Sequence, residues 1–242
     1  MPLSSIISTR RSVLISQVTL VARISSGVPR MNVQSPPPSI LKIESRTQYV
    51  SPPFGPADVH SDPLVQFRQW FANATAPLNA EQGKSSSTNP TFSTKSKVLE
   101  PEAMSFSTAT ASGIPSTRMV LLKEVDLKGF VFFTNYTSRK SKEMIENPHV
   151  ALGFYWKELR QQVRVVGRVE KLEEEKSDRY WKSRPLQSRV SARASLQSSV
   201  ILDEEELAKR VKQVEERFGV QEGKDVDIPR PEIWGGWRVI PE

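Results

Sequence analysis

Hydrophobic residues repeat with two different periods along the chain, and the period separates helical segments from extended ones. A helix is predicted from Ser61, where Ser61 or Asp62 can cap the first turn and Pro63 is well tolerated. Four apolar residues recur at helical spacing and are expected in the core: Leu64, Phe67, Trp70 and Phe71. The polar stretch 79–97 predicts a loop after this helix.

After this loop the pattern changes to period two and short apolar runs, which predicts a set of strands. The predicted strands are Ala103–Ala109, Thr117–Leu122, Gly129–Thr134, Val150–Trp156 and Gln162–Lys171. In the last of these, valines alternate with glutamine and arginine, so one face should be buried and the other polar. A turn at 126–129 and a short helix from Ser138 to Glu146 are expected between the strands.

The remaining chain is predicted to be helical up to a final strand. Helices are expected over 173–183, from Pro185 onward, and over Asp203–Phe218, where Asp203 and Glu206 can form a capping box. Leu207, Val211, Val214 and Phe218 form the apolar stripe of the last helix. Trp234–Ile240 is predicted as the final strand. Together these elements predict a mainly β or α+β fold class, a small antiparallel barrel with peripheral helices.

Composition excludes several classes of protein. The chain has no cysteine, which excludes disulfides, thiolate metal sites, iron–sulfur clusters and a cysteine nucleophile. It has two histidines, His60 and His149, so we expect no metal centre and few options for a Ser–His–Asp hydrolase. No apolar run approaches the roughly 18 residues that a transmembrane helix needs, so no membrane partner is expected.

The positive charge is concentrated at the N-terminus. Residues 1–43 hold five basic residues and no Asp or Glu, and they supply most of the net charge of +7. A nucleic-acid partner needs clustered charge on a folded face, so none is expected. A leader with arginines, many serines and no acids is typical of an organelle transit peptide. A disordered tail, or an extension upstream of a true start at Met31, has the same composition. The expected localisation is therefore cytoplasmic or mitochondrial.

The segment Ser138-Arg139-Lys140 contains a local conflict that indicates an anion site. Ser138 is a natural N-cap, which places Arg139 and Lys140 on the first helical turn. Cations there oppose the helix dipole, whereas a bound anion would be stabilised by the dipole, by free backbone N–H groups and by both cations. The alternative is that both side chains point into solvent.

Further polar residues could bind a second anion or a heterocycle. In a regular strand Arg118 and Lys123 lie on opposite faces, so they would serve different groups unless a bulge intervenes. Tyr180 and Arg184 share one helix face, Ser188 follows about one turn later, and the three together can bind phosphate. Exposed strand charges and a solvated helix end are the alternatives.

Two amide-bearing positions, Gln162 and Gln197-Ser198, carry a weaker signal. An amide presents a donor and an acceptor together, which suits the edge of a flavin or a pyrimidine.

Taken in order, these pieces resemble the pyridoxine 5′-phosphate oxidase family of flavin enzymes. The resemblance covers about four fifths of the chain, and the matching segments are Arg46–Tyr49, Asp62–Phe67, Arg118–Lys123, Phe133–Lys140, Gln162–Val165, Tyr180–Pro185, Gln197–Ser199 and Trp234–Gly236. Several long motifs in the right order are more specific than any one of them. The resemblance also implies that residues 44–242 form the oxidase domain.

The resemblance implies an FMN-binding split barrel that forms a homodimer, with FMN in clefts at the dimer interface. It assigns to FMN the residues Arg118, Met119, Val120, Leu121, Phe133, Thr134, Arg139, Lys140, Gln162, Gln197, Ser198 and Trp234. It assigns to the substrate the residues Arg46, Tyr49, Lys123, Tyr180, Arg184 and Ser188. The implied reaction oxidises pyridoxine or pyridoxamine 5′-phosphate to pyridoxal 5′-phosphate, with O2 as acceptor and H2O2 as product. The cofactor carries the redox chemistry, so no catalytic side chain is assigned.

Two departures from the family pattern leave an alternative open. The sequence ends at Glu242, before the segment in which the family carries an Arg-x-His pair that contacts substrate. Ser191 stands where the family usually has glycine. The alternative is therefore a splice form or a non-catalytic paralogue that binds FMN or pyridoxal phosphate.

Overall fold

The computed structural model describes residues 54–76, 98–200 and 204–242, which all belong to one unit, Tyr49–Glu242. Several expectations fall outside these residues: the leader 1–43, the substrate residues Arg46 and Tyr49, the loop 79–97 and the cap Asp203. In the described ranges no helix has the length and apolar character that a membrane crossing requires.

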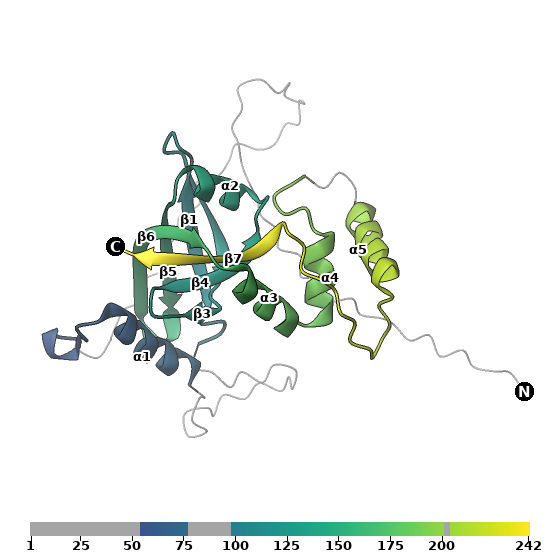
Figure 1. Ribbon diagram of the computed structural model, residues 1–242. Coiled ribbons are helices and arrows are strands. Elements are labelled where there is room, and N and C mark those ends of the chain that lie inside the picture. The colour runs from purple at the N-terminus through teal and green to yellow at the C-terminus, as the bar shows by residue number, and fades with distance from the viewer. Residues whose placement is uncertain (1–53, 77–97, 201–203) are drawn as a thin grey trace, which may run out of the picture. The chain divides into compact units, whose positions relative to one another are not determined.

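Seven antiparallel strands form one curled sheet in the order β2-β1-β5-β6-β7-β4-β3 (Figure 1). Their bounds are β1 Ala103–Ala109, β2 Pro115–Leu121, β3 Glu124–Val125, β4 Phe130–Asn135, β5 His149–Trp156, β6 Gln161–Lys171 and β7 Trp234–Pro241. The two edge strands, β2 and β3, are consecutive in the chain and are separated only by Leu122 and Lys123. Because so short a link cannot span a flat sheet, the sheet must curve until its edges meet.

The alternation seen in the sequence matches the burial in the strands. Side chains of β1 alternate between buried and half-buried, with Met104 and Phe106 facing the core. The predicted strands are confirmed to within two residues at each end, and β2 begins earlier than expected because Pro115 still pairs with Ala109. The two-residue strand β3 was not predicted. It is too short for a periodic signal, and pairing with β4 alone defines it.

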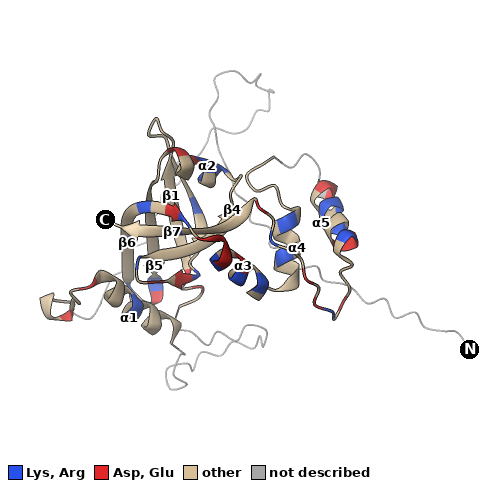
Figure 2. Ribbon diagram, viewed as in Figure 1, with Lys and Arg blue, Asp and Glu red and all other residues tan. Residues whose placement is uncertain are grey.

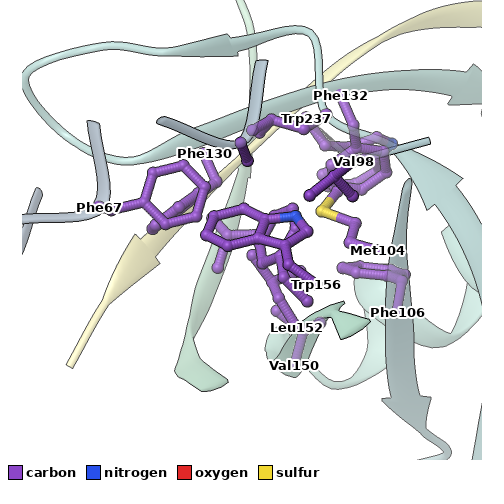
Figure 3. Close-up of a cluster of buried hydrophobic side chains, with 14 of the residues drawn as sticks. Phe67, Val98, Met104, Phe106, Phe130, Phe132, Val150, Leu152, Trp156 and Trp237 are labelled. Carbon is purple, nitrogen blue, oxygen red and sulfur yellow. The ribbon is translucent and has the colours of Figure 1, made fainter. Parts of the chain in front are cut away.

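The main core lies inside the curled sheet (Figure 3), and α1, Pro63–Thr75, covers one end of the sheet (Figure 1). Of the two predicted caps, Ser61 and Asp62, it is Asp62 that caps this helix, with Oδ1 accepting from Leu64 N at 2.8 Å. Phe67 projects from α1 into the core, where its ring centroid lies 4.9 Å from that of Phe130 and 5.1 Å from that of Phe154. Burying such a ring contributes about 1.5–3 kcal/mol, so α1 is held by its aromatic face rather than by helix propensity.

A second hydrophobic cluster lies beside the barrel, between helices and the start of β7. The helices are α3 Glu174–Ser183, α4 Leu186–Ala194 and α5 Glu204–Phe218, whereas α2 Arg139–Glu146 packs on the main core through Met144. Trp181, Val190, Ile228 and Trp234 form the centre of this cluster, and the apolar stripe of α5 packs against it. Trp181 Nε1 donates to Ile228 O at 2.6 Å, which ties α3 to the segment that leads into β7.

Candidate active site

Four charged residues gather where α2 meets β1 and β2, and we call Arg118, Arg139, Lys140 and Glu143 the α2 cluster. Figure 2 shows basic and acidic positions side by side along α2. Ser138 caps α2 as predicted, so Arg139 and Lys140 occupy its first turn. Glu143 is buried, and its Oε1 accepts from Arg139 Nε at 2.7 Å while its Oε2 accepts from Arg118 Nη2 at 3.3 Å. Thus a carboxylate one turn into the helix joins two of the cations predicted to bind an anion.

Arg118 is held firmly by the strands beneath it. Its Nη1 donates to Thr108 Oγ1 at 2.6 Å and to Ser116 O at 3.0 Å, and its Nη2 donates to Ser116 Oγ at 2.8 Å. Burial lowers the pKa of Arg118, and the carboxylate of Glu143 opposes that effect. Burial alone would raise the pKa of Glu143, but hydrogen bonds from Thr108 and Arg139, with the charges of both arginines, lower it. Both side chains therefore stay charged at neutral pH.

Lys140 is a buried cation whose hydrogen-bond acceptors are all neutral. Its Nζ donates to Gln197 Oε1 at 2.9 Å, Thr134 Oγ1 at 3.1 Å and Ser138 Oγ at 3.3 Å. No carboxylate of the described residues forms an ion pair with it. Burial, and then the charge of Arg118, lower the pKa of Lys140 to about 8. A buried ammonium without a counter-ion is costly, and a bound anion would remove that cost.

A cavity of about 400 Å³ opens between β3, β4 and α3, and we call it the α3 cavity. It is lined by Lys123, Glu124, Phe133, Lys176, Arg179 and Tyr180. The ring of Tyr180 stacks on that of Phe133, with centroids 3.9 Å apart and planes inclined by 16°. The cavity therefore combines an aromatic wall with cations from two sides, which suits a planar ligand with an anionic group.

Lys123 reaches the α3 cavity because the chain changes partner strands there. Leu122 N still donates to Glu102 O at 2.9 Å, whereas Lys123 N donates to Val131 O of β4 at 2.9 Å. This crossing, rather than a bulge, separates Lys123 from Arg118. The structure thus places Arg118 and Lys123 apart, and the expectation that they serve different groups stays a prediction.

Arg184 and Ser188 lie at the junction of α3 and α4. The Arg184 guanidinium carbon lies 4.7 Å from the ring centroid of Trp234 and 5.3 Å from that of Trp181. Its Nη1 is buried and has no hydrogen-bond partner among the described residues. Burial lowers the pKa of Arg184. Ser188 is half-buried in the first turn of α4, one turn beyond Arg184. An unpaired buried guanidinium N–H marks a place where an acceptor is expected.

The structure does not bring all the predicted FMN residues together within one chain. Met119 and Leu121 are 57% and 42% exposed on the outer face of the sheet, and Gln162 lies on the same outer face in β6. Val120 points the other way and packs against the core. Trp234 is only 5% exposed and stacks behind Phe133, with ring centroids 5.5 Å apart, so it supports the aromatic wall from within.

Gln197 and Ser198 lie in a tight turn beside the α2 cluster. Thr134 Oγ1 donates to Gln197 Oε1 at 2.9 Å, which joins two predicted residues and Lys140 in one network. Ser198 has φ 69°, a left-handed conformation that a serine adopts at a cost of about 1–2 kcal/mol. Such a conformation occurs more often at binding sites than elsewhere.

Comparisons of the sequence with known proteins identify the family of this chain. Residues 93–218 match the family model described as pyridoxamine 5′-phosphate oxidase. The chain belongs to this family. A pyridoxine/pyridoxamine 5′-phosphate oxidase from Burkholderia thailandensis is 45% identical over 196 residues, covering 81% of this chain and 80% of that protein. A protein of the same name from Trichormus variabilis is 43% identical over equal shares of the two chains.

The structural comparison supports the oxidase fold. PhzG from Burkholderia lata, solved in complex with tetrahydrophenazine-1-carboxylic acid, has a TM-score of 0.64 and 28% identity. The match covers 79% of this chain and 83% of PhzG. Family and fold together show a split-barrel member of an FMN-binding oxidoreductase family, and the predicted fold class is confirmed.

Sequence reasoning missed several polar residues of this oxidase-family site. Glu143 was not singled out, although its spacing of four from Arg139 is the signal of a helical ion pair. Lys176 and Arg179 of α3 also line the α3 cavity, and Lys176 pairs with Glu124 at 2.8 Å. No local signal separates Lys176 from any other charged residue of a solvated helix, because its partner is 52 residues away.

Proposed function

We propose that residues 44–242 form an FMN-dependent oxidase that converts pyridoxine or pyridoxamine 5′-phosphate to pyridoxal 5′-phosphate, with O2 reduced to H2O2. Family membership supports the reaction class. The observation that carries the proposal is that the cations fall into two separate groups, the α2 cluster and the cations of the α3 cavity, each able to bind one anion. A cofactor phosphate and a substrate phosphate require two such sites.

The α2 cluster fits the phosphate of FMN. Its three cations and one carboxylate carry a net charge of about +2, which balances the charge of about −1.5 to −2 on a phosphate monoester. Lys140 supplies a buried ammonium without a counter-ion, and Arg139 supplies a partly exposed guanidinium. When bound, FMN provides the two-electron acceptor and the route to O2.

The remaining FMN contacts are proposed from residues beside this anchor, on the outer face of the sheet and, for Val120, Phe133 and Trp234, packed against the two hydrophobic clusters. They are Met119, Val120, Leu121, Phe133, Thr134, Gln162, Gln197, Ser198 and Trp234, together with Arg118 of the α2 cluster. The network through Thr134 and Gln197 holds Lys140 in place.

The α3 cavity fits a planar substrate that carries a phosphate. Lys123 and Tyr180 line the cavity, and Arg184 and Ser188, which lie outside its lining at the junction of α3 and α4, are proposed to complete the phosphate site from there. The stacked rings of Phe133 and Tyr180 form an apolar wall that excludes water from one side. Arg46 and Tyr49 are proposed to complete the substrate site from the segment outside the described residues.

We propose a homodimer because the predicted FMN residues lie on two different sides of the sheet, some in and beside the α2 cluster and others on the outer face. The outer face of β2, β5 and β6 exposes four large apolar side chains: Met119, Leu121, Tyr155 and Val166. It also carries Gln162, far along the sheet order from the α2 cluster. A second copy packed on this face would bury the apolar residues and bring Gln162 and Met119 of one protomer toward the cofactor of the other.

Peroxide release tests the oxidase assignment. The protein is purified, loaded with FMN and supplied with pyridoxine 5′-phosphate in the presence of O2. We expect H2O2 and pyridoxal 5′-phosphate in equal amounts. Unphosphorylated pyridoxine, the matched control, should react at least about 100-fold less efficiently, because the phosphate makes several charge-assisted hydrogen bonds.

The outcome also decides the alternative. Bound FMN without peroxide release would identify a non-catalytic flavin-binding protein. Equal turnover of pyridoxine and its phosphate would contradict the assignment of the cavity cations to a substrate phosphate.

A further inference from the structure

The guanidinium of Arg139 is hydrogen-bonded through Nε, and its two terminal nitrogens are free of hydrogen bonds to the described residues. Its Nε donates to Glu143 Oε1 at 2.7 Å, and this is its one hydrogen bond among the described residues. Its side chain is 44% exposed, whereas that of Glu143 is 6% exposed. The two terminal amino groups, which can bind two oxygens at once, therefore stay available to a ligand.

Glu143 is itself fixed from three directions. Thr108 Oγ1 of β1 and Arg118 Nη2 of β2 donate to its Oε2, while Arg139 Nε of α2 donates to Oε1. The carboxylate is thus hydrogen-bonded to β1 and β2 on one side and to Arg139 of α2 on the other, so the two strands fix where the Arg139 side chain lies. An arginine on an exposed first turn would otherwise sample many rotamers, and ordering such a side chain costs about 1–2 kcal/mol.

A carboxylate beside an anion site has an electrostatic cost. At close range Glu143 repels a phosphate, so charge alone would make its presence unfavourable for cofactor binding. Its burial and its three donors show a built arrangement rather than a solvated surface charge. The two effects have opposite signs, and this makes the role of Glu143 testable.

We propose that Glu143 is a positioning residue for the cofactor phosphate. It anchors Arg139 through Nε, with Arg118 and Thr108 as its supports, so that the terminal amino groups of Arg139 face the phosphate of FMN. This inference rests on the proposed function, since it requires that the α2 cluster binds that phosphate. It adds an acidic residue to a site otherwise defined by its cations.

The test compares the affinities of FMN and riboflavin, measured by quenching of flavin fluorescence. Riboflavin lacks the phosphate, so it reports on the rest of the flavin site. Glu143→Gln keeps the shape but places an NH2 group against one of the donors. We expect the Kd of FMN to rise about tenfold, as for a lost charge-assisted hydrogen bond, and the Kd of riboflavin to stay within about twofold.

Matched variants separate positioning from charge. Glu146→Gln makes the same charge change on the exposed end of α2 and should leave FMN binding within about twofold. Glu143→Asp keeps both acceptor oxygens and should retain more affinity than Glu143→Gln. In an Arg139→Ala background Glu143→Gln should weaken FMN no further, because the residue through which it acts is gone.

A surface variant keeps the test valid if Glu143→Gln does not fold. Arg139→Lys retains the positive charge but has no Nε for Glu143 to hold, and it changes a partly exposed side chain. We expect it to weaken FMN about tenfold and to leave riboflavin unchanged.

The outcomes distinguish the two proposals. If the wild-type protein binds riboflavin and FMN equally, the α2 cluster is not a phosphate site, and the proposed function fails with this inference. If the wild type prefers FMN but Glu143→Gln binds it as well or better, Glu143 acts only as a repelling charge and the positioning role is overturned. Wild-type FMN affinity in Arg139→Lys would overturn it as well.

Discussion

The two proposed anion sites of this protein are built differently. In the α2 cluster Lys140 and Glu143 are buried and hydrogen-bonded before any ligand arrives, whereas the terminal amino groups of the partly exposed Arg139 have no partner in the described part of the chain and stay free to bind one. In the α3 cavity Lys123 is exposed, and the cavity is open to solvent beside it. Folding already removes most of the water from the buried charges of the α2 cluster. In the α3 cavity the charges stay hydrated, and each ligand that binds must displace that water.

This difference agrees with the ligands proposed for the two sites. A cofactor that stays bound through many turnovers benefits from a preorganised anchor, because little rotamer entropy is lost on binding. A substrate that enters and leaves at every turnover benefits from exposed charges, which attract it from solution and still allow it to dissociate. The contrast predicts that substitutions in one site leave the other ligand almost unaffected.

The largest effect is expected from removing both first-turn cations. Arg139→Ala combined with Lys140→Ala should raise the Kd of FMN at least about 100-fold, since each lost charge-assisted hydrogen bond contributes about 1.5–3 kcal/mol. Titration of the apoprotein with FMN measures this. Lys142→Ala, which removes an exposed cation of the same helix, is the control and should change the Kd less than about twofold. Similar affinities in the double variant and the control would contradict the phosphate assignment of the α2 cluster.

A smaller effect is expected in the α3 cavity. Lys123→Ala should raise the KM for pyridoxine 5′-phosphate about tenfold, because one exposed phosphate contact is lost, and should leave the Kd of FMN unchanged. Steady-state peroxide assays with saturating FMN measure the KM. Lys128→Ala in the exposed turn after β3 is the charge-matched control. Loss of FMN in Lys123→Ala would show that the two sites are not separate.

The mildest test changes only pH. Because the pKa of Lys140 is lowered to about 8, raising the pH through 8 removes its charge in the free protein, while a bound phosphate favours the charged form. FMN affinity should therefore be nearly constant between about pH 7, where the phosphate is largely dianionic, and pH 8, and should fall about tenfold per pH unit above pH 8, up to the pKa of the bound state.

Lys140→Arg is the comparison for that pH series. Its guanidinium stays charged over the same range, so any remaining FMN affinity should be nearly independent of pH between 7 and about 9.5. An equally steep fall in this variant would assign the titration to another group.

Local pattern was enough to locate most elements. The strand Ala103–Ala109 and the cap at Ser138 follow from alternation and from capping chemistry within a few neighbouring residues. The family motifs identified Lys140, Thr134 and Gln197, and the structure joins these three in one network. The motifs did not reveal that Gln162 and Met119 lie on a different face from this network within one chain.

By itself the sequence determined the period of each segment, the start of α1, both ends of α2, and the family of the chain, because all of these depend on residues close together or on ordered motifs. The tertiary structure decided which residues from distant parts of the sequence are neighbours. Only the closing of the sheet separates Lys123 from Arg118, through two residues that leave β1 and join β4. Only the packing of α2 on β1 and β2 gives Glu143 its contacts with Thr108 and Arg118, which lie 35 and 25 residues away. Periodicity specifies which side of a strand is apolar but not which strand is its neighbour, so these contacts depend on the whole curled sheet.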